Sequence, residues 1–217
     1  MIIIFDLDDT LYSRQNFINA AIKNIVHFIY SKNKKISKKV LFKILHKIFK
    51  DSNIKLKLNF FLKKIFLSKK YLKDCINIFR YSKKKISLYK DAMSILNTHK
   101  NKCYLITDGN KLVQKNKIEQ LGVKKFFKKI FITNTYGLKY QKPSLFCFKK
   151  IRKIEKCSFS QMVYIGDNPK KDFVNCNKAG MLTVRLLRGE FKTLRIARNF
   201  DAKYKIKNLK EVNKLFG

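Results

Sequence analysis

Near its start the chain reads Ile2-Ile3-Ile4-Phe5-Asp6-Leu7-Asp8-Asp9-Thr10. The first four of these residues are apolar and mostly β-branched, and the acidic residues that follow end the apolar run. The pattern therefore predicts a short buried strand at residues 2–5. In an open parallel sheet, ligands bind beyond the carboxyl ends of the strands, so Asp6 and Asp8 are candidates for chemistry.

Other apolar runs of the same kind follow along the chain. We predict further strands at residues 103–106, 130–132, 162–165, 182–184 and 204–206. Helix-length segments lie between or after them, at residues 91–97, 111–121, 144–155, 170–179 and 208–215. Continuous apolar strands that alternate with helices are typical of a parallel sheet covered on both faces. We therefore expect the fold class α/β, with a Rossmann-like parallel sheet.

Residues 13–88 break this alternation. They contain no Gly or Pro, and their apolar residues recur at helical spacing, as in Phe17, Ala21 and Ile25. They also hold 21 basic residues against 2 acidic ones. We therefore expect two domains, an α/β core made of residues 1–12 and 89–217 and an all-helical domain made of residues 13–88.

The whole chain is strongly basic, with 51 Lys and Arg against 14 Asp and Glu in 217 residues, a net charge of +37. Its hydrophobic content of 46% excludes a disordered polybasic tail. Most of the basic residues are Lys, whereas surfaces that grip phosphate favour the bidentate fork of Arg. Lysine codons are rich in A and T, so the base composition of the genome can explain most of the lysine excess. A real attraction for anions is the alternative. No helix-turn-helix, zinc-finger or RNP signature accompanies the charge, so the sequence does not favour nucleic acid as a partner.

The five cysteines are odd in number and widely spaced, and they form no CxxC pair. This pattern is typical of a reduced, intracellular protein. No uncharged apolar run reaches the about 20 residues that a membrane-spanning helix needs. We expect a cytoplasmic protein without a transmembrane segment.

The scarce acidic residues are concentrated at the predicted strand ends. Carboxylates gathered at one edge of a sheet repel one another unless a cation joins them, and oxygen ligands of this kind suit Mg²⁺. The sequence therefore predicts a metal-loaded carboxylate site. Six of the 14 acidic residues follow three predicted strands directly, namely Asp6, Asp8, Asp9, Asp108, Asp167 and Asp172.

Two further residues suit an anionic substrate. Thr107 follows the second strand and can donate a hydroxyl hydrogen bond to a phosphoryl oxygen, and Lys142, before Pro143, can offer an ammonium. Phosphoryl transfer requires a nucleophile in line with the leaving group, a metal ion, and donors for the equatorial oxygens. A carboxylate can be that nucleophile by forming an acyl phosphate.

Four segments of the chain resemble, in the same order, the four motifs of the haloacid dehalogenase (HAD) superfamily. The segments are Phe5-Asp6-Leu7-Asp8-Asp9-Thr10-Leu11, Leu105-Ile106-Thr107-Asp108-Gly109-Asn110, Lys142-Pro143 and Gly166-Asp167-Asn168-Pro169-Lys170-Lys171-Asp172. The resemblance spans essentially the whole chain and implies a hydrolase of the phosphatase type. In this superfamily an insertion between the first two motifs is a helical cap of the C1 type, which residues 13–88 are then expected to form.

The resemblance implies catalytic roles for the first two carboxylates. Asp6 would be the nucleophile that is transiently phosphorylated, and Asp8 the general acid and base. Members that displace halide lack a carboxylate at the position of Asp8, because halide leaves without a proton. The resemblance therefore favours a phosphatase over a dehalogenase.

The resemblance also implies a metal site and a phosphate site. Asp6, the backbone carbonyl of Asp8 and Asp167 would hold Mg²⁺. Thr107 and Lys142 would bind the phosphoryl group, and Lys142 would also neutralise the carboxylates.

Three other acidic residues have roles that are less defined. Asp172 would support the metal site, either as a neighbour of its ligands or through a water molecule. Asp108 suits contact with the substrate phosphate and capping of its loop equally well. Asp9 is as readily assigned to turn geometry as to catalysis.

We therefore expect a Mg²⁺-dependent phosphatase that hydrolyses a small phosphomonoester through an aspartyl-phosphate. Sugar phosphates, nucleoside monophosphates and phosphoglycolate all remain candidate substrates. A phosphomutase of the same superfamily is the alternative within enzymes, because it uses the same groups. A noncatalytic basic protein that binds nucleic acid or an anionic membrane is the alternative outside enzymes.

Overall fold

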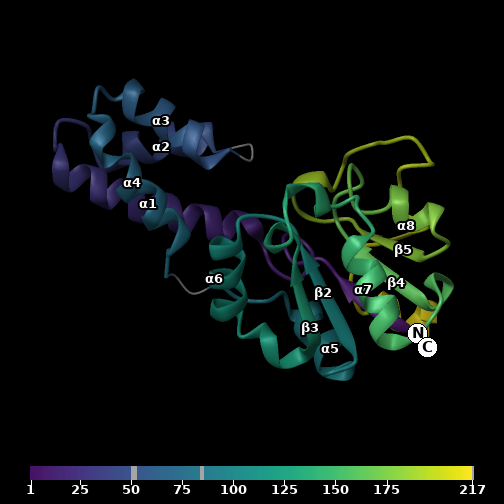
Figure 1. Ribbon diagram of the computed structural model, residues 1–217. Coiled ribbons are helices and arrows are strands. Elements are labelled where there is room, and N and C mark those ends of the chain that lie inside the picture. The colour runs from purple at the N-terminus through teal and green to yellow at the C-terminus, as the bar shows by residue number, and fades with distance from the viewer. Residues whose placement is uncertain (50–52, 84–85, 217) are drawn as a thin grey trace. The chain divides into compact units, whose positions relative to one another are not determined.

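The computed structural model describes residues 1–49, 53–83 and 86–216 (Figure 1). The chain divides into two compact units. The first comprises Met1–Arg14 and Ile86–Gly217, and the second comprises Gln15–Lys85. Among the described residues, every helix is too short or too polar to cross a membrane.

The first unit is built on a six-stranded sheet whose paired strands all run parallel. The strand order is β3-β2-β1-β4-β5-β6, so β1 lies between β2 and β4. The chain therefore moves away from β1 on one side and returns on the other, which makes the end of β1 a topological switch point. The strands are β1 (Ile2–Phe5), β2 (Cys103–Thr107), β3 (Phe127–Ile132), β4 (Met162–Gly166), β5 (Leu182–Leu186) and β6 (Tyr204–Ile206).

Helices cover both faces of this sheet, which confirms the predicted α/β fold (Figure 1). Most of the apolar strand residues are buried, and Ile4 and Tyr104 belong to one core cluster. The same cluster contains Phe148 and Tyr164, whose rings pack edge to face with their centroids 5.0 Å apart. Burial on both faces explains why the strands carry continuous apolar runs. The helices are α5 (Lys90–Thr98), α6 (Lys111–Leu121), α7 (Phe146–Glu155), α8 (Val174–Lys178) and α9 (Glu211–Phe216). Short 3-10 turns also lie here, at Val123–Phe126, Thr133–Thr135, Leu138–Tyr140, Phe159–Gln161 and Gly189–Phe191.

One predicted helix is shorter in the structure. The sequence pattern predicts a helix over residues 170–179, but α8 begins only at Val174. The residues before it form a turn in which the carbonyl of Asn168 accepts from the backbone N–H groups of Lys171 and Asp172. This turn brings Asp172 back toward Gly166 at the end of β4. The residues that were predicted as the first turn of the helix therefore form part of the candidate site described below.

Within the described residues 15–49 and 53–83, the regular structure of the second unit is helical. Its apolar residues recur at the predicted helical spacing, and those of α1 that include Phe17, Ala21 and Ile25 are buried. The ring of Phe79 on α4 meets Phe17 edge to face and Phe49 in a stack. The assignment of this unit as a C1-type cap stays a prediction. The helices are α1 (Arg14–Lys32), α2 (Lys38–Ile48), α3 (Ile54–Lys64) and α4 (Leu72–Arg80), with a 3-10 turn at Lys69–Tyr71.

In the first unit, the segment after β5 is tied to the sheet by Arg185. The Nη1 atom of Arg185 donates to both carboxylate oxygens of Asp201, at 3.2 and 3.1 Å. The Nη2 atom donates to the carbonyls of Phe191 and Leu194, at 2.6 and 2.9 Å. Arg185 and Asp201 are both buried. One guanidinium therefore holds the segment between β5 and β6 against β5.

We expect Arg185→Met to lower the free energy of unfolding by about 3 kcal/mol, because it leaves a buried carboxylate without this partner. Lys205 contacts the same carboxylate at 2.8 Å, but its side chain is half exposed. Lys205→Met should therefore cost less than about 1 kcal/mol. Urea denaturation followed by circular dichroism gives both values, and equal losses for the two variants would contradict the anchoring role of Arg185.

Candidate active site

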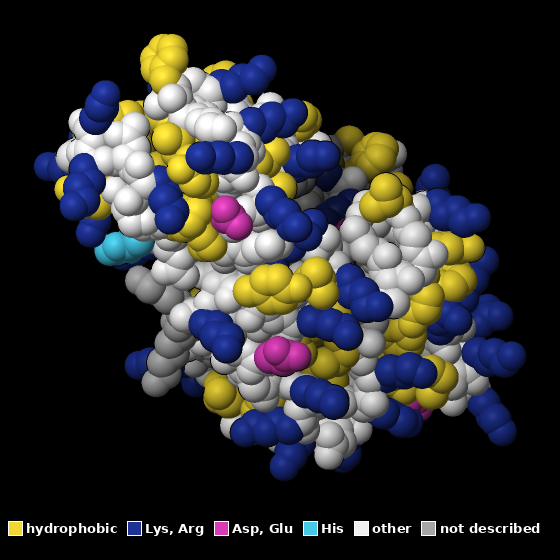
Figure 2. All heavy atoms as spheres, turned by 60° about the vertical axis from the view of Figure 1, so that its left-hand side comes forward, with side chains coloured by type: hydrophobic (Ala, Val, Ile, Leu, Met, Phe, Trp, Pro, Cys, Tyr) yellow, Lys and Arg dark blue, Asp and Glu magenta, His cyan; other side chains and the backbone are white. Residues whose placement is uncertain are grey.

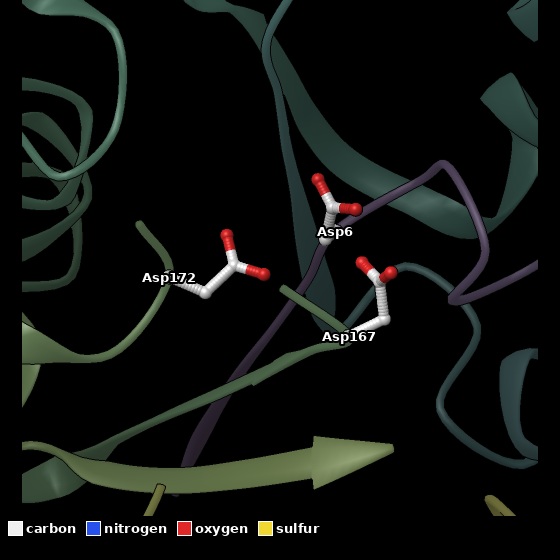
Figure 3. Close-up of side chains that lie close together, drawn as sticks. All are labelled: Asp6, Asp167 and Asp172. Carbon is white, nitrogen blue, oxygen red and sulfur yellow. The ribbon is translucent and has the colours of Figure 1, made fainter. Parts of the chain in front are cut away.

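Three neighbouring strands deliver polar side chains to one edge of the sheet. Asp6 follows β1, Thr107 ends β2, and Asp167 follows β4. Figure 3 shows that Asp6, Asp167 and Asp172 turn their carboxylates toward a common centre. One oxygen of each carboxylate lies within 4.8 Å of one from each of the others, and all three residues are buried. The structure thus brings together three of the carboxylates that the sequence analysis singled out.

Lys142 lies against this cluster with a side chain that is only 1% exposed. Its Nζ atom donates to Oδ1 of Asp6 at 2.6 Å and to the hydroxyl of Tyr164 at 2.8 Å, and it lies 2.8 Å from Oδ1 of Asp172. Burial alone would lower the pKa of this ammonium, but the charges of Asp172 and Asp6 outweigh burial and raise the pKa of Lys142 well above its usual value. Lys142 is therefore a permanent positive charge in the site.

Asp172 is held in the cluster by the backbone around it. Its Oδ2 atom accepts from the backbone N–H of Asn168 at 2.9 Å. A Cβ atom at Gly166 would lie 2.5 Å from the same oxygen. Any side chain at position 166 would therefore push the carboxylate away, and glycine at the end of β4 is what allows Asp172 to approach.

The three carboxylates carry more negative charge than Lys142 can balance. Burial raises the pKa of Asp6 to about 7, and the charge of Asp172 adds to this while Lys142 opposes it. Burial and the charges of Asp172 and Asp6 raise the pKa of Asp167 well above its usual value. A divalent cation would relieve this repulsion, and three carboxylate oxygens are the hard donors that Mg²⁺ prefers. The donor set therefore fits the metal that the sequence analysis predicted.

The carboxylate of Asp8 lies outside this cluster, in a separate set of donors. Nζ of Lys117 lies 2.7 and 2.8 Å from its two oxygens, Nε2 of Gln114 donates to Oδ2 at 3.1 Å, and the hydroxyl of Tyr12 donates to Oδ1. Burial would raise the pKa of Asp8, but the Lys117 ammonium and these hydrogen bonds outweigh it and lower the pKa to about 2. The predicted metal contact of Asp8 concerns its backbone carbonyl and stays a prediction.

Thr107 and Asp108 continue the site from β2. Nε2 of Gln114 donates to Oγ1 of Thr107 at 2.5 Å. The carboxylate of Asp108 accepts from Oγ1 of Thr133 at 2.7 Å, from Nζ of Lys171 at 3.0 Å, and from the backbone N–H of Lys142 at 3.2 Å. Asp108 therefore joins three loops beside the site, and its predicted contact with phosphate stays a prediction.

Asp9 is not one of the three clustered carboxylates, and it organises a turn. Its Oδ1 atom accepts from the backbone N–H of Arg14 at 3.0 Å, and its φ of 55° is left-handed. Gly189 packs so closely that a Cβ atom there would lie 2.4 Å from the Cβ of Asp9. These contacts support turn geometry, one of the two readings that the sequence left open.

The side chains that surround Asp8 and Lys142 were not among the predicted site residues. Gln114 and Lys117 lie on α6, on the face that also buries Val113, Ile118 and Leu121. Their positions on the apolar face of a predicted helix were the signal that could have identified them, because a polar residue on such a face needs a buried partner. Tyr12 and Tyr164 gave no such signal, because a tyrosine in an apolar segment is ordinary core material.

Comparisons with known proteins identify the family of the chain. The family model described as haloacid dehalogenase-like hydrolase matches residues 3–186. The glyceraldehyde 3-phosphate phosphatase of Methanocaldococcus jannaschii is 31% identical over 97% of this chain and 94% of that protein. The protein of the same name from Methanothermobacter thermautotrophicus is 25% identical over 84% of this chain and 83% of that protein.

Solved structures share the fold. The HAD-hydrolase YfnB from Bacillus subtilis, solved with magnesium bound, has a TM-score of 0.72 and 18% identity, covering 100% of this chain and 98% of that chain. An HAD phosphatase from Thermococcus onnurineus has a TM-score of 0.64 and 21% identity, covering 100% and 97% of the two chains.

The family model matches most of the chain, and the M. jannaschii relative matches nearly all of it. Together they confirm the predicted superfamily and the predicted enzyme class, a hydrolase of the phosphatase type. The chain therefore belongs to the haloacid dehalogenase-like hydrolase family.

Proposed function

We propose that the chain is a Mg²⁺-dependent phosphatase that hydrolyses a small phosphomonoester through an aspartyl-phosphate on Asp6. The observation that carries the proposal is the separation of two carboxylates two residues apart. Asp6 lies among carboxylates with Lys142, whereas Asp8 is held apart by Lys117 and Gln114. Two acids in different surroundings suit two different chemical roles.

In the first step, a carboxylate oxygen of Asp6 attacks the phosphorus atom. The bond between phosphorus and the ester oxygen breaks, and that oxygen leaves as an alcohol with a proton from Asp8. Without substrate the pKa of Asp8 is about 2. The negative charge of the bound phosphate raises this pKa, so Asp8 takes up a proton when the substrate binds and then passes it to the leaving oxygen. Lys142 and the hydroxyl of Thr107 donate to the phosphoryl oxygens, which carry the charge of the transition state. The product is a mixed anhydride between Asp6 and phosphate.

In the second step, a water molecule attacks the same phosphorus atom and gives its proton to the carboxylate of Asp8. The bond between phosphorus and the Asp6 oxygen breaks, which releases inorganic phosphate and restores both carboxylates to their starting states. Buried Asp6 thus acts as nucleophile and then as leaving group. Asp8 gives one proton and regains one.

Mg²⁺ would be held by Asp6, Asp167 and the backbone carbonyl of Asp8, with Asp172 as a supporting carboxylate. When bound, it supplies positive charge that lets Asp6 and the phosphoryl group approach each other. The buried excess of negative charge supports this assignment. So does the magnesium bound in the YfnB structure, which shares the fold.

We propose glyceraldehyde 3-phosphate, or a phosphorylated metabolite of similar size, as the substrate. The support comes from the relatives, because five of them carry the name of glyceraldehyde 3-phosphate phosphatase. The chain matches 94% of the length of the M. jannaschii protein. We also propose a reducing, cytoplasmic location, which the five free cysteine thiols support.

Asp6→Asn should lower turnover of p-nitrophenyl phosphate by at least about 10³-fold, because an amide cannot form the acyl phosphate. Asp9→Asn is the matched control, since its amide oxygen can still accept from Arg14 and the carboxylate has a turn role. It should keep activity within about 10-fold of wild type. Phosphate release and thermal melting are measured for both, and a folded Asp6→Asn with near wild-type turnover would refute the nucleophile.

Chelation of divalent cations should abolish activity, and added Mg²⁺ should restore it. Mg²⁺ should also raise the melting temperature of the chelated protein, because it binds the folded carboxylate cluster and relieves repulsion there. In Asp167→Asn, half-maximal activation should need about 10-fold or more Mg²⁺. Hydrolysis that continues unchanged in excess chelator would contradict the metal site.

A panel of phosphomonoesters should identify a triose phosphate as the preferred substrate. We expect kcat/KM for glyceraldehyde 3-phosphate to exceed that for phosphoglycolate, glucose 6-phosphate and AMP by about 10-fold or more. Released phosphate is measured with saturating Mg²⁺. A strong preference for another member of the panel would contradict the proposed substrate but not the two-step mechanism.

A further inference from the structure

Two buried polar side chains on α6 border the candidate site without belonging to any of the four motifs. Gln114 is 1% exposed and Lys117 is 5% exposed. The helix begins directly after the β2 loop, where the side chain of Asn110 accepts from the N–H groups of Leu112 and Val113. Burial of an ammonium is costly unless it is paired, so Lys117 must be held there by a specific interaction.

The ammonium of Lys117 forms an ion pair with the carboxylate of Asp8. Its Nζ atom lies 2.7 Å from one carboxylate oxygen and 2.8 Å from the other. Contact with both oxygens fixes the plane of the carboxylate as well as its position. The hydroxyl of Tyr12, from the loop that follows β1, donates to Oδ1 as well. Asp8 is therefore clamped between its own loop and α6.

Gln114 links Asp8 to the phosphate side of the site. Its Nε2 atom lies 3.1 Å from Oδ2 of Asp8, 2.5 Å from Oγ1 of Thr107 and 2.8 Å from the carbonyl of Asp108. An amide nitrogen has two hydrogens, and here they are shared among three acceptors. Because the amide donates to Oγ1 of Thr107, the hydroxyl hydrogen of Thr107 is left to point at another acceptor. A phosphoryl oxygen is such an acceptor.

We propose that Lys117 and Gln114 are positioning residues of the phosphatase reaction. Lys117 holds the carboxylate of Asp8 where it can exchange a proton with the ester oxygen, and Gln114 turns the hydroxyl of Thr107 toward the phosphoryl group. The inference rests on the proposed function, and it adds two residues of α6 to the motif residues. α6 thereby fixes the spacing between the proton-transfer group and the phosphate-binding group.

The two residues predict different kinetic signatures. Departure of an alkoxide needs a proton, whereas the leaving group of p-nitrophenyl phosphate departs without one. Lys117→Met should therefore lower kcat/KM by about 100-fold for an alkyl phosphate and by less than about 5-fold for p-nitrophenyl phosphate. Gln114→Met should lower kcat/KM by about 10-fold for both substrates, because both present the same phosphoryl group to Thr107.

The experiment measures kcat/KM for glyceraldehyde 3-phosphate, or for the best alkyl phosphate of the panel, and for p-nitrophenyl phosphate in each variant. Lys115→Met is the matched control, since it removes an exposed lysine from the same helix and should match wild type. Thermal melting checks that each variant folds. If Lys117→Met does not fold, Lys117→Gln, which keeps one donor without the charge, replaces it.

Selective loss on the alkyl substrate supports the positioning role of Lys117. Equal losses on both substrates, or no loss on either, would overturn it and leave Lys117 as a structural residue. Asp6→Asn separates this result from the proposed function. If Asp6→Asn is inactive while Lys117→Met behaves like wild type, only the positioning inference fails. If Asp6→Asn is active, the phosphatase mechanism itself fails.

Discussion

Mutual repulsion among three buried carboxylates is the constraint on which the site depends. Asp6, Asp167 and Asp172 lie within reach of one cation, and Lys142 contacts two of them. Such a cluster is unfavourable by itself, because each buried charge raises the cost of the next. The fold keeps the cluster together because Asp6 and Asp167 follow adjacent strands, and because Asp172 sits on a turn whose backbone N–H groups donate to the carbonyl of Asn168, just after β4. The cluster lowers the free energy of unfolding, and it leaves the site suited to bind a cation and, through Lys142, a phosphate group.

The site also keeps two nearby carboxylates, Asp6 and Asp8, chemically different. Asp6 has its pKa raised to about 7, and Asp8 has its pKa lowered to about 2. Burial acts in the same direction on both groups. The difference comes from their neighbours, because Asp6 faces like charges as well as Lys142, whereas Asp8 faces Lys117, Gln114 and Tyr12. The chain leaves the strand after Phe5, so Asp8 lies in the loop beyond β1, where Tyr12 and Lys117 of α6 reach its carboxylate.

Local patterns were sufficient to predict the sheet, because each strand is a short apolar run bounded by polar residues. They also placed Asp6, Thr107 and Asp167 correctly at strand ends, since a strand end is a local property. The turn before α8 was predicted as helix, because residues 170–173 contain no Gly or Pro. The position of the Asp172 carboxylate depends instead on contacts with Lys142, which is distant in the sequence, and with Tyr164 on β4. Lys117 was missed for a similar reason. Its pairing with Asp8 joins residues 109 positions apart, and no spacing rule reports such a contact.

The basic excess and the acidic cluster now have separate explanations. Figure 2 shows lysine and arginine side chains spread over the face that it draws, with few acidic ones among them. Three arginines, however, pair with carboxylates of the same chain: Arg185 with Asp201 and Arg188 with Asp91 in buried or largely buried pairs, and Arg14 with Glu190 in a more exposed one. Lysine supplies most of the remaining charge as dispersed point charges, which attract anions at long range without selecting among them. We therefore propose that a phosphomonoester is selected at the strand ends, where the buried lysines and carboxylates have fixed partners.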